Sequence, residues 1–200
     1  CLNCETDFVA KNDDFSKLAN YFIELALESN SDSLEDFLKL NYQDSGLSIS
    51  EKITEQSGVI GEKIKISFFD KIVSEKVVAY NHPGNQIASL VGLTVDAEDI
   101  GKQVAMQVAA MNPIALDQES VSQDVIDREI EVGKELAIQE GKPLEMAEKI
   151  AKGRLNKFFK ETTLLNQAFI RDNKKSVGQF IKESDPDLMV TSFKRYSLSI

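Results

Sequence analysis

The spacing of apolar residues changes along this chain, and this change limits the fold more than any other feature of the sequence. Between Asp13 and Ser29 apolar side chains recur every three or four residues, which predicts a helix with one buried face. Residues 63–68 then alternate polar and apolar side chains, as a half-buried strand does. Because the chain combines both periods, we expect an α+β fold with antiparallel strands.

Capping and turn signals predict the remaining elements. Ser48 with Glu51, and Ser176 with Gln179, form capping boxes that open helices. Two β-rich runs on either side of a Pro-Gly turn predict an antiparallel hairpin. Asp96 is the predicted N-cap of one helix, and Gly58 is the predicted end of another. The predicted helices cover residues 33–40, 48–57, 96–111 and 176–184. The predicted strands cover residues 77–80, 86–95 and 188–200.

Residues 121–159 carry two apolar stripes among many charged residues. Gly141-Lys142-Pro143 separates the stripes, and so tight a connection predicts two helices folded back as an antiparallel pair. Strands are predicted on both sides of the pair, so the simplest topology is an α+β domain interrupted by an inserted helical arm. The pair is thinly apolar, which leaves two alternatives. It packs on its parent domain, or it projects and packs on a second copy.

The formal net charge of −10 and the pI near 4.7 argue against a nucleic acid as the main ligand, because phosphate backbones are bound by clustered Lys and Arg. No apolar run approaches the ~18 residues that suggest a membrane span. No signal peptide is visible, so we expect a cytoplasmic protein without a membrane partner. The chain opens with Cys1, and its first residues resemble the middle of a domain, so we interpret the sequence as a fragment.

The 33 acidic residues supply many carboxylate pairs, but nothing in the sequence ranks one pair above another as a catalytic site. Beyond Cys1 and Cys4 the only other soft ligand is His82, too few for a structural zinc site. A dithiol oxidoreductase built on the two cysteines would need a preceding strand and helix, so a reduced cytosolic pair at a strand end is the simpler interpretation. Nucleotide-binding glycine loops, HExxH and GxSxG do not occur in the sequence. We therefore expect a binding protein rather than an enzyme, with no metal and no cofactor.

Several blocks, in order along the chain, resemble one family. The first block, residues 3–12, contains Thr6-Asp7-Phe8-Val9 ahead of a helix that carries Phe15. The other blocks are 105–110 with Asn112-Pro113, 141–143 with 147–150 and 153–155, 164–169, and 176–179. Together they resemble bacterial-type elongation factor Ts over nearly all 200 residues, and colinear blocks are far more specific than a single motif.

This resemblance implies a fold of two α+β core subdomains with an inserted coiled-coil arm. Residues 1–75 would form the first subdomain, 76–117 with 161–200 the second, and 118–160 the arm, which would form a homodimer or dock beside the partner. The family's N-terminal helical module would lie outside this chain.

The resemblance also implies guanine nucleotide exchange on the translational GTPase elongation factor Tu. Thr6, Asp7, Phe8 and Val9 would enter the GTPase near its bound magnesium, with Phe8 as an apolar wedge and Asp7 as a polar contact. Taken alone, a phenylalanine at a helix start is more often packed in its own core.

His82 in the hairpin turn would be a second contact with the GTPase, with a solvated turn residue as the alternative. The family's glycine-rich turn with an arginine is replaced here by Pro83-Gly84-Asn85-Gln86, which removes the contact of that arginine. A second functional hypothesis is a protein-interaction module that binds a GTPase without exchange activity.

Overall fold

The structure is a computed structural model that describes residues 1–29 and 31–198, and it confirms the α+β fold class. The chain forms two units, Cys1–Lys71 and Ile72–Ile200, and each has its own hydrophobic core. Among the described residues no helix is both long enough and apolar enough to cross a membrane.

In the first unit, helices surround a core of aromatic and aliphatic side chains. Its elements are β1 (Leu2–Asn3), α1 (Asp7–Ala10), α2 (Asp13–Glu28), α3 (Leu34–Leu38), the 3-10 helix η1 (Gln43–Ser45), α4 (Ile49–Ile60) and β2 (Lys65–Ile66). The predicted apolar stripe of α2 buries Phe15, Leu18 and Phe22 in this core. Phe37 meets Phe22 edge to face with ring centroids 6.5 Å apart and stacks on Phe69 at 5.0 Å.

Two boundaries in the first unit differ from the prediction. The predicted helix end at Gly58 is wrong, because α4 continues to Ile60 and ends at Gly61. Gly61 has a left-handed φ of 79°, and its N–H donates to Ser57 O at 3.0 Å, so it closes the last turn in place of Gly58. The predicted strand over 63–68 is reduced to Lys65–Ile66, because its antiparallel partner β1 pairs through Leu2 and Asn3.

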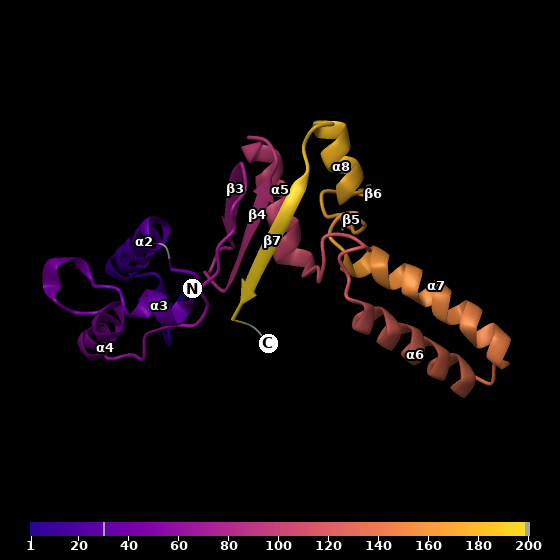
Figure 1. Ribbon diagram of the computed structural model, residues 1–200, viewed down its shortest axis with the longest axis horizontal. Helices are drawn as coiled ribbons and strands as arrows, with labels where there is room; N and C mark the ends of the chain where they lie inside the picture. Colours follow the sequence, from indigo (N-terminus) through magenta and orange to yellow (C-terminus); the bar gives the residue numbers. More distant parts are fainter. Residues whose placement is uncertain (30, 199–200) are drawn as a thin grey trace. The chain divides into compact units, whose positions relative to one another are not determined.

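In the second unit an antiparallel sheet carries helix α5 (Glu98–Met111) on one face (Figure 1). The strands β3 (Lys76–Asn81), β4 (Ile87–Leu93) and β7 (Val190–Ser197) pair in the order β3-β4-β7, and β3 with β4 is the predicted hairpin. A Cβ on Gly101 would lie 2.7 Å from the side chains of Val78 and Leu93, so the close approach of α5 to the sheet requires glycine there.

The predicted N-cap of α5 is wrong. The helix begins after Ala97 without a side-chain cap, and the Asp96 carboxylate instead pairs with Lys76 at 2.9 Å. Helix α5 ends at Asn112, whose φ of 44° is left-handed, which agrees with the predicted stop at Asn112-Pro113.

A small hairpin and a short helix complete the second core. They are β5 (Ala168–Phe169), β6 (Asp172–Ser176) and α8 (Val177–Ser184). The predicted capping box of Ser176 and Gln179 is confirmed at the start of α8. The predicted final strand over 188–200 is shorter, since β7 covers Val190–Ser197 and positions 199–200 lie outside the described residues.

Helices α6 (Gln123–Gln139) and α7 (Leu144–Thr162) lie side by side as the predicted antiparallel pair (Figure 1). They meet through small buried residues, and a Cβ on Gly133 would lie 3.1 Å from Ala151 Cα. Large apolar side chains on the pair remain exposed, namely Val132, Leu136, Ile138, Leu144 and Met146. These side chains are not buried against the parent domain, and their pairing with a second copy stays a prediction.

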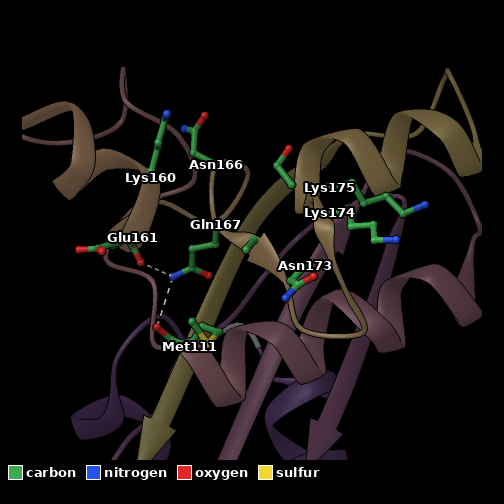
Figure 2. A pocket seen from close by; sticks show the side chains of 10 residues that line it. Met111, Lys160, Glu161, Asn166, Gln167, Asn173, Lys174 and Lys175 are labelled. Carbon is green, nitrogen blue, oxygen red and sulfur yellow. Dashed lines mark hydrogen bonds between the residues drawn. The ribbon is translucent and has the colours of Figure 1, made fainter.

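Gln167 links the C-terminal ends of α5 and α7 in the second unit (Figure 2). Its side-chain amide donates to Met111 O at 3.3 Å and to Glu161 O at 2.9 Å, near the ends of α5 and α7. Gln107 Nε2 donates to Gln167 Oε1 at 3.1 Å, and both side chains are fully buried. Buried amides satisfied in this way fix the backbone groups that they bind.

Candidate partner-binding site

Thr6 joins β1 to the short helix α1 and is its N-cap. The residue is extended, with φ −120° and ψ 155°, and its hydroxyl accepts a hydrogen bond from the Val9 N–H at 3.4 Å. The Ala10 N–H donates to Thr6 O at 3.2 Å. The Thr6-Asp7-Phe8-Val9 run precedes the helix that carries Phe15, as the sequence predicts, and it also forms the cap and first turn of a short helix of its own.

Glu62, which follows the end of α4, holds the segment before α1. Its Oε2 accepts hydrogen bonds from the backbone N–H groups of Glu5 and Thr6, each at 3.0 Å. Its Oε1 accepts a further hydrogen bond from the Thr6 hydroxyl. One carboxylate therefore satisfies three donors in two consecutive residues, and hydrogen bonds to an ionised acceptor are the stronger kind.

Phe8 projects from α1 into solvent, with 83% of its surface exposed. The alternative interpretation, a ring packed in the core of its own unit, is wrong. Its neighbour Val9 is half-buried and packs against that core. Consecutive residues of α1 thus have opposite roles, since Val9 anchors the helix and Phe8 presents an apolar ring outward.

Asp7 and Lys11 form an exposed ion pair along α1, with Lys11 Nζ 2.7 Å from Asp7 Oδ2. The hydrogen bond from Lys11, and then its charge, hold the pKa of Asp7 below its ordinary value. The hydrogen bond from the Thr6 hydroxyl is the main reason why the pKa of Glu62 is also lowered. Both carboxylates are therefore ionised at neutral pH, and Asp7 in the first turn of α1 suits the positive end of the helix dipole.

His82 lies in the β3–β4 turn of the second unit and is exposed. Its Nδ1 is hydrogen-bonded to the Tyr80 hydroxyl at 2.9 Å, and its carbonyl accepts from the Asn85 N–H at 2.9 Å. Asn85 and Gly84 both have positive φ, 57° and 95°, so the backbone of the turn is tightly defined. The Tyr80 contact orients the exposed imidazole.

Comparison with known proteins decides which family this chain belongs to. The family described as Elongation factor TS matches residues 5–199. The chain is 54% identical over 200 residues to Elongation factor Ts of Christiangramia forsetii, and 47% identical over 200 residues to Elongation factor Ts of Flavobacterium psychrophilum. Each alignment covers 98% of this chain and 72% of the relative. This chain belongs to the elongation factor Ts family. Membership gives it a role in translation elongation.

The two cysteines of this chain are free thiols, with Cys1 exposed and Cys4 half-buried. The Cys4 thiol donates to Thr6 O at 3.2 Å. Burial, and then the negative charge of Glu62, raise the pKa of Cys4, which keeps the thiol protonated and argues against a reactive dithiol. Within residues 1–29 and 31–198, no group of three or more His, Cys, Asp or Glu could hold a metal ion.

A hollow of ≈ 410 Å³ lies where the helical pair joins the second core, lined by Met111, Asn166 and Gln167 among others (Figure 2). Lysines at its rim do not converge on it. Lys160 and Lys174 point in different directions in Figure 2, and Lys175 pairs with Glu183 at 2.8 Å. The hollow therefore lacks the concentrated positive charge that a nucleotide phosphate requires.

The sequence predicted the Thr6–Val9 run and His82 as site residues, but it did not predict the supporting roles of Glu62 and Tyr80. Glu62 lies 56 residues from Thr6, and its only local signal is its position directly after a glycine that ends a helix. Tyr80 carries a clearer signal, because residues two apart on a strand point to the same face.

Proposed function

We propose that this chain promotes GDP release from elongation factor Tu by inserting Phe8 beside the magnesium and phosphate site of that GTPase. The observation that carries the proposal is an aromatic ring 83% exposed in the first turn of a short helix, which is capped by Thr6 and packed on the core through Val9. A large exposed apolar side chain in a held backbone is typical of an interaction site. Thr6 and Val9 support the ring, and Asp7 offers a polar contact next to it.

The mechanism follows from linkage. Magnesium and a phosphate-cradling loop hold the nucleotide, so a protein that displaces either weakens nucleotide binding without competing for the base. Each ligand must then lower the affinity of the other by the same factor. A thousandfold change corresponds to roughly 4 kcal/mol. Burying one phenylalanine side chain contributes about 1.5–3 kcal/mol, so Phe8 and its surrounding contacts are sufficient.

His82 belongs to the same proposal as a second contact from the β3–β4 turn. The chain would act by protein binding in the cytoplasm, without a cofactor and without enzymatic chemistry of its own. The family subdomains, 1–75 and 76–117 with 161–200, and dimerisation or docking through 118–160, stay predictions.

Release of a fluorescent GDP analogue from elongation factor Tu tests the proposal. We expect the unmodified chain to accelerate release and Phe8→Ala to reduce the acceleration by about tenfold or more, because the wedge is lost. The thermal midpoint of Phe8→Ala should stay unchanged, because an exposed ring contributes little to folding.

The matched control is Leu27→Ala, which removes a side chain 70% exposed from α2 of the same unit and should leave the release rate unchanged. If the complex forms but the unmodified chain does not accelerate release, the chain is an interaction module without exchange activity. If Phe8→Ala and Leu27→Ala behave alike, Phe8 is not the wedge.

A further inference from the structure

We propose that Glu62 is a positioning residue that holds Phe8 in the orientation required for partner binding. This inference rests on the proposed function for its consequence, but its structural part can be measured separately. Phe8 does not fix its own position, because its ring is 83% exposed. Helix α1 covers only Asp7–Ala10, far shorter than a helix that is stable by itself. Neighbouring groups must therefore fix the direction of the ring.

Glu62 makes the long-range contacts that hold the start of α1. It binds the backbone of Glu5 and Thr6 and the Thr6 hydroxyl, residues separated from it by 56 or 57 positions. Thr6 in turn caps α1 through Val9 N–H. A short chain of contacts thus runs from the Glu62 carboxylate through Thr6 to the first turn of the helix that carries Phe8.

Glu62 is itself fixed on both sides. Gly61 before it closes α4 by donating to Ser57 O at 3.0 Å. Ile64 after it is buried in the first core, and its N–H donates to Ser57 Oγ at 3.0 Å. The backbone on both sides of Glu62 is therefore held by hydrogen bonds and by the core of the unit. The hydrogen bonds from Thr6 to the Glu62 carboxylate fix the position of Thr6 relative to that core.

The expected role is preorganisation. Without Glu62, water would satisfy the Glu5 and Thr6 N–H groups, and the segment between β1 and α1 would sample more conformations. A partner would then have to order the segment on binding, which weakens the complex even though every contact residue is still present. Glu62 acts in this account through Thr6 and Phe8, and it need not touch the partner.

Two substitutions separate this role from a simple effect on folding. Glu62→Ala removes all three hydrogen bonds. Glu62→Gln keeps a carbonyl oxygen that can accept from Glu5 and Thr6 N–H, so it should restore part of the function. The matched control is Glu55→Ala, which removes the same charge from α4 at an exposed position that pairs with Lys52.

The structural readout is amide hydrogen exchange of Glu5 and Thr6 in the full chain. We expect both amides to exchange about tenfold faster or more in Glu62→Ala, to be intermediate in Glu62→Gln and to be unchanged in Glu55→Ala. Equal exchange in Glu62→Ala and the unmodified chain would overturn the inference. This measurement does not involve the partner. It therefore tests the role of Glu62 even if the chain does not promote GDP release and the proposed function fails.

The functional readout is acceleration of GDP release. Glu62→Ala should lower it about tenfold, while Phe8→Ala combined with Glu62→Ala should be no worse than Phe8→Ala alone, because both changes act on one ring. Additive losses would mean that Glu62 acts independently of Phe8, and the inference would be rejected. If Glu62→Ala speeds up amide hydrogen exchange but leaves GDP release unaltered, the link between the fixed position of Phe8 and nucleotide release is rejected.

Discussion

At the residue scale, Thr6 uses one hydroxyl group for two purposes. The oxygen accepts from Val9 N–H as a helix cap, and the proton is donated to Glu62. An ionised carboxylate accepts the hydrogen bonds from the hydroxyl and the two N–H groups more strongly than a neutral carboxyl group does, so the charge of Glu62 adds to the order of the segment. Any condition that protonates Glu62 should therefore loosen the start of α1.

The pKa of Glu62 is lowered in the folded chain, first by the hydrogen bond from the Thr6 hydroxyl and then by the N–H groups of Thr6 and Glu5. For a lowered carboxyl pKa, the contribution to order is complete above the unfolded value of about 4.3. It is lost as the pH falls through the lower folded value. We expect the Thr6 amide shift, followed by NMR, to stay constant from neutral pH down to about pH 5 and to change only below the unfolded value.

Glu62→Gln provides the control for this titration, because its amide does not ionise and the step should vanish. A step with its midpoint above the ordinary glutamate value would contradict the lowered pKa. Lys11 lowers the pKa of Asp7 as well, so only the step that disappears in Glu62→Gln belongs to Glu62.

At the element scale, local signals predicted helix starts better than helix ends. The capping boxes at Ser48 and Ser176 are confirmed, because both halves of each box lie within four residues. Asp96 also looked like an N-cap, but Lys76 from a neighbouring strand engages its carboxylate. Gly58 looked like a stop, but Gly61 closes the helix instead. A tertiary contact decides the first case, and it is not visible in a short window of sequence. In the second case two glycines lie three residues apart, and the sequence does not show which of them takes the left-handed conformation that ends the helix.

The close packing of α6 against α7 can be tested by substituting one glycine in each helix. Gly133→Ala should destabilise the α6–α7 pair by about 1–3 kcal/mol, because the new Cβ would lie 3.1 Å from Ala151 Cα and the helices would have to separate. Thermal unfolding followed by circular dichroism measures the change.

Gly153→Ala is the matched control, since apart from the adjacent helix backbone no heavy atom lies within 4 Å of a Cβ there. It should stabilise the chain by about 0.5–1 kcal/mol through helix propensity alone. If both variants shift the midpoint in the same direction, the close contact of Gly133 with Ala151 is not a feature of the folded chain.

At the scale of the whole molecule, the sequence predicted the α+β class and the helical pair from periodicity, because these depend on repeated local patterns. The candidate site came from a resemblance centred on Thr6-Asp7-Phe8-Val9. Periodicity could not show that Phe8 is exposed, since a helix of four residues is too short to display a polar face. Glu62 could not be found either, because its partners are distant in sequence and meet only in the folded unit.

The charge of the whole chain makes a further prediction, that it does not bind RNA directly at physiological salt. The formal net charge is −10, and many lysines are already paired with acids, as in Lys39 with Glu35 and Lys175 with Glu183. Fluorescence anisotropy of a labelled transfer RNA measures this. We expect no binding at 200 mM salt up to about 50 µM protein, because non-specific affinity depends on clustered cations and falls steeply with salt.

The hollow is where RNA binding would be expected if this prediction is wrong, because Lys160, Lys174 and Lys175 line it. The acids beside these lysines include Glu161 in the lining and Glu183, which pairs with Lys175. Changing both acids, in Glu161→Lys with Glu183→Lys, should create weak binding that disappears between 50 and 200 mM salt, as expected for counterion release. That variant shows that the assay can detect binding. A dissociation constant below about 10 µM for the unmodified chain at 200 mM salt would contradict the prediction. It would mean that a local basic surface binds RNA despite the negative net charge of the chain.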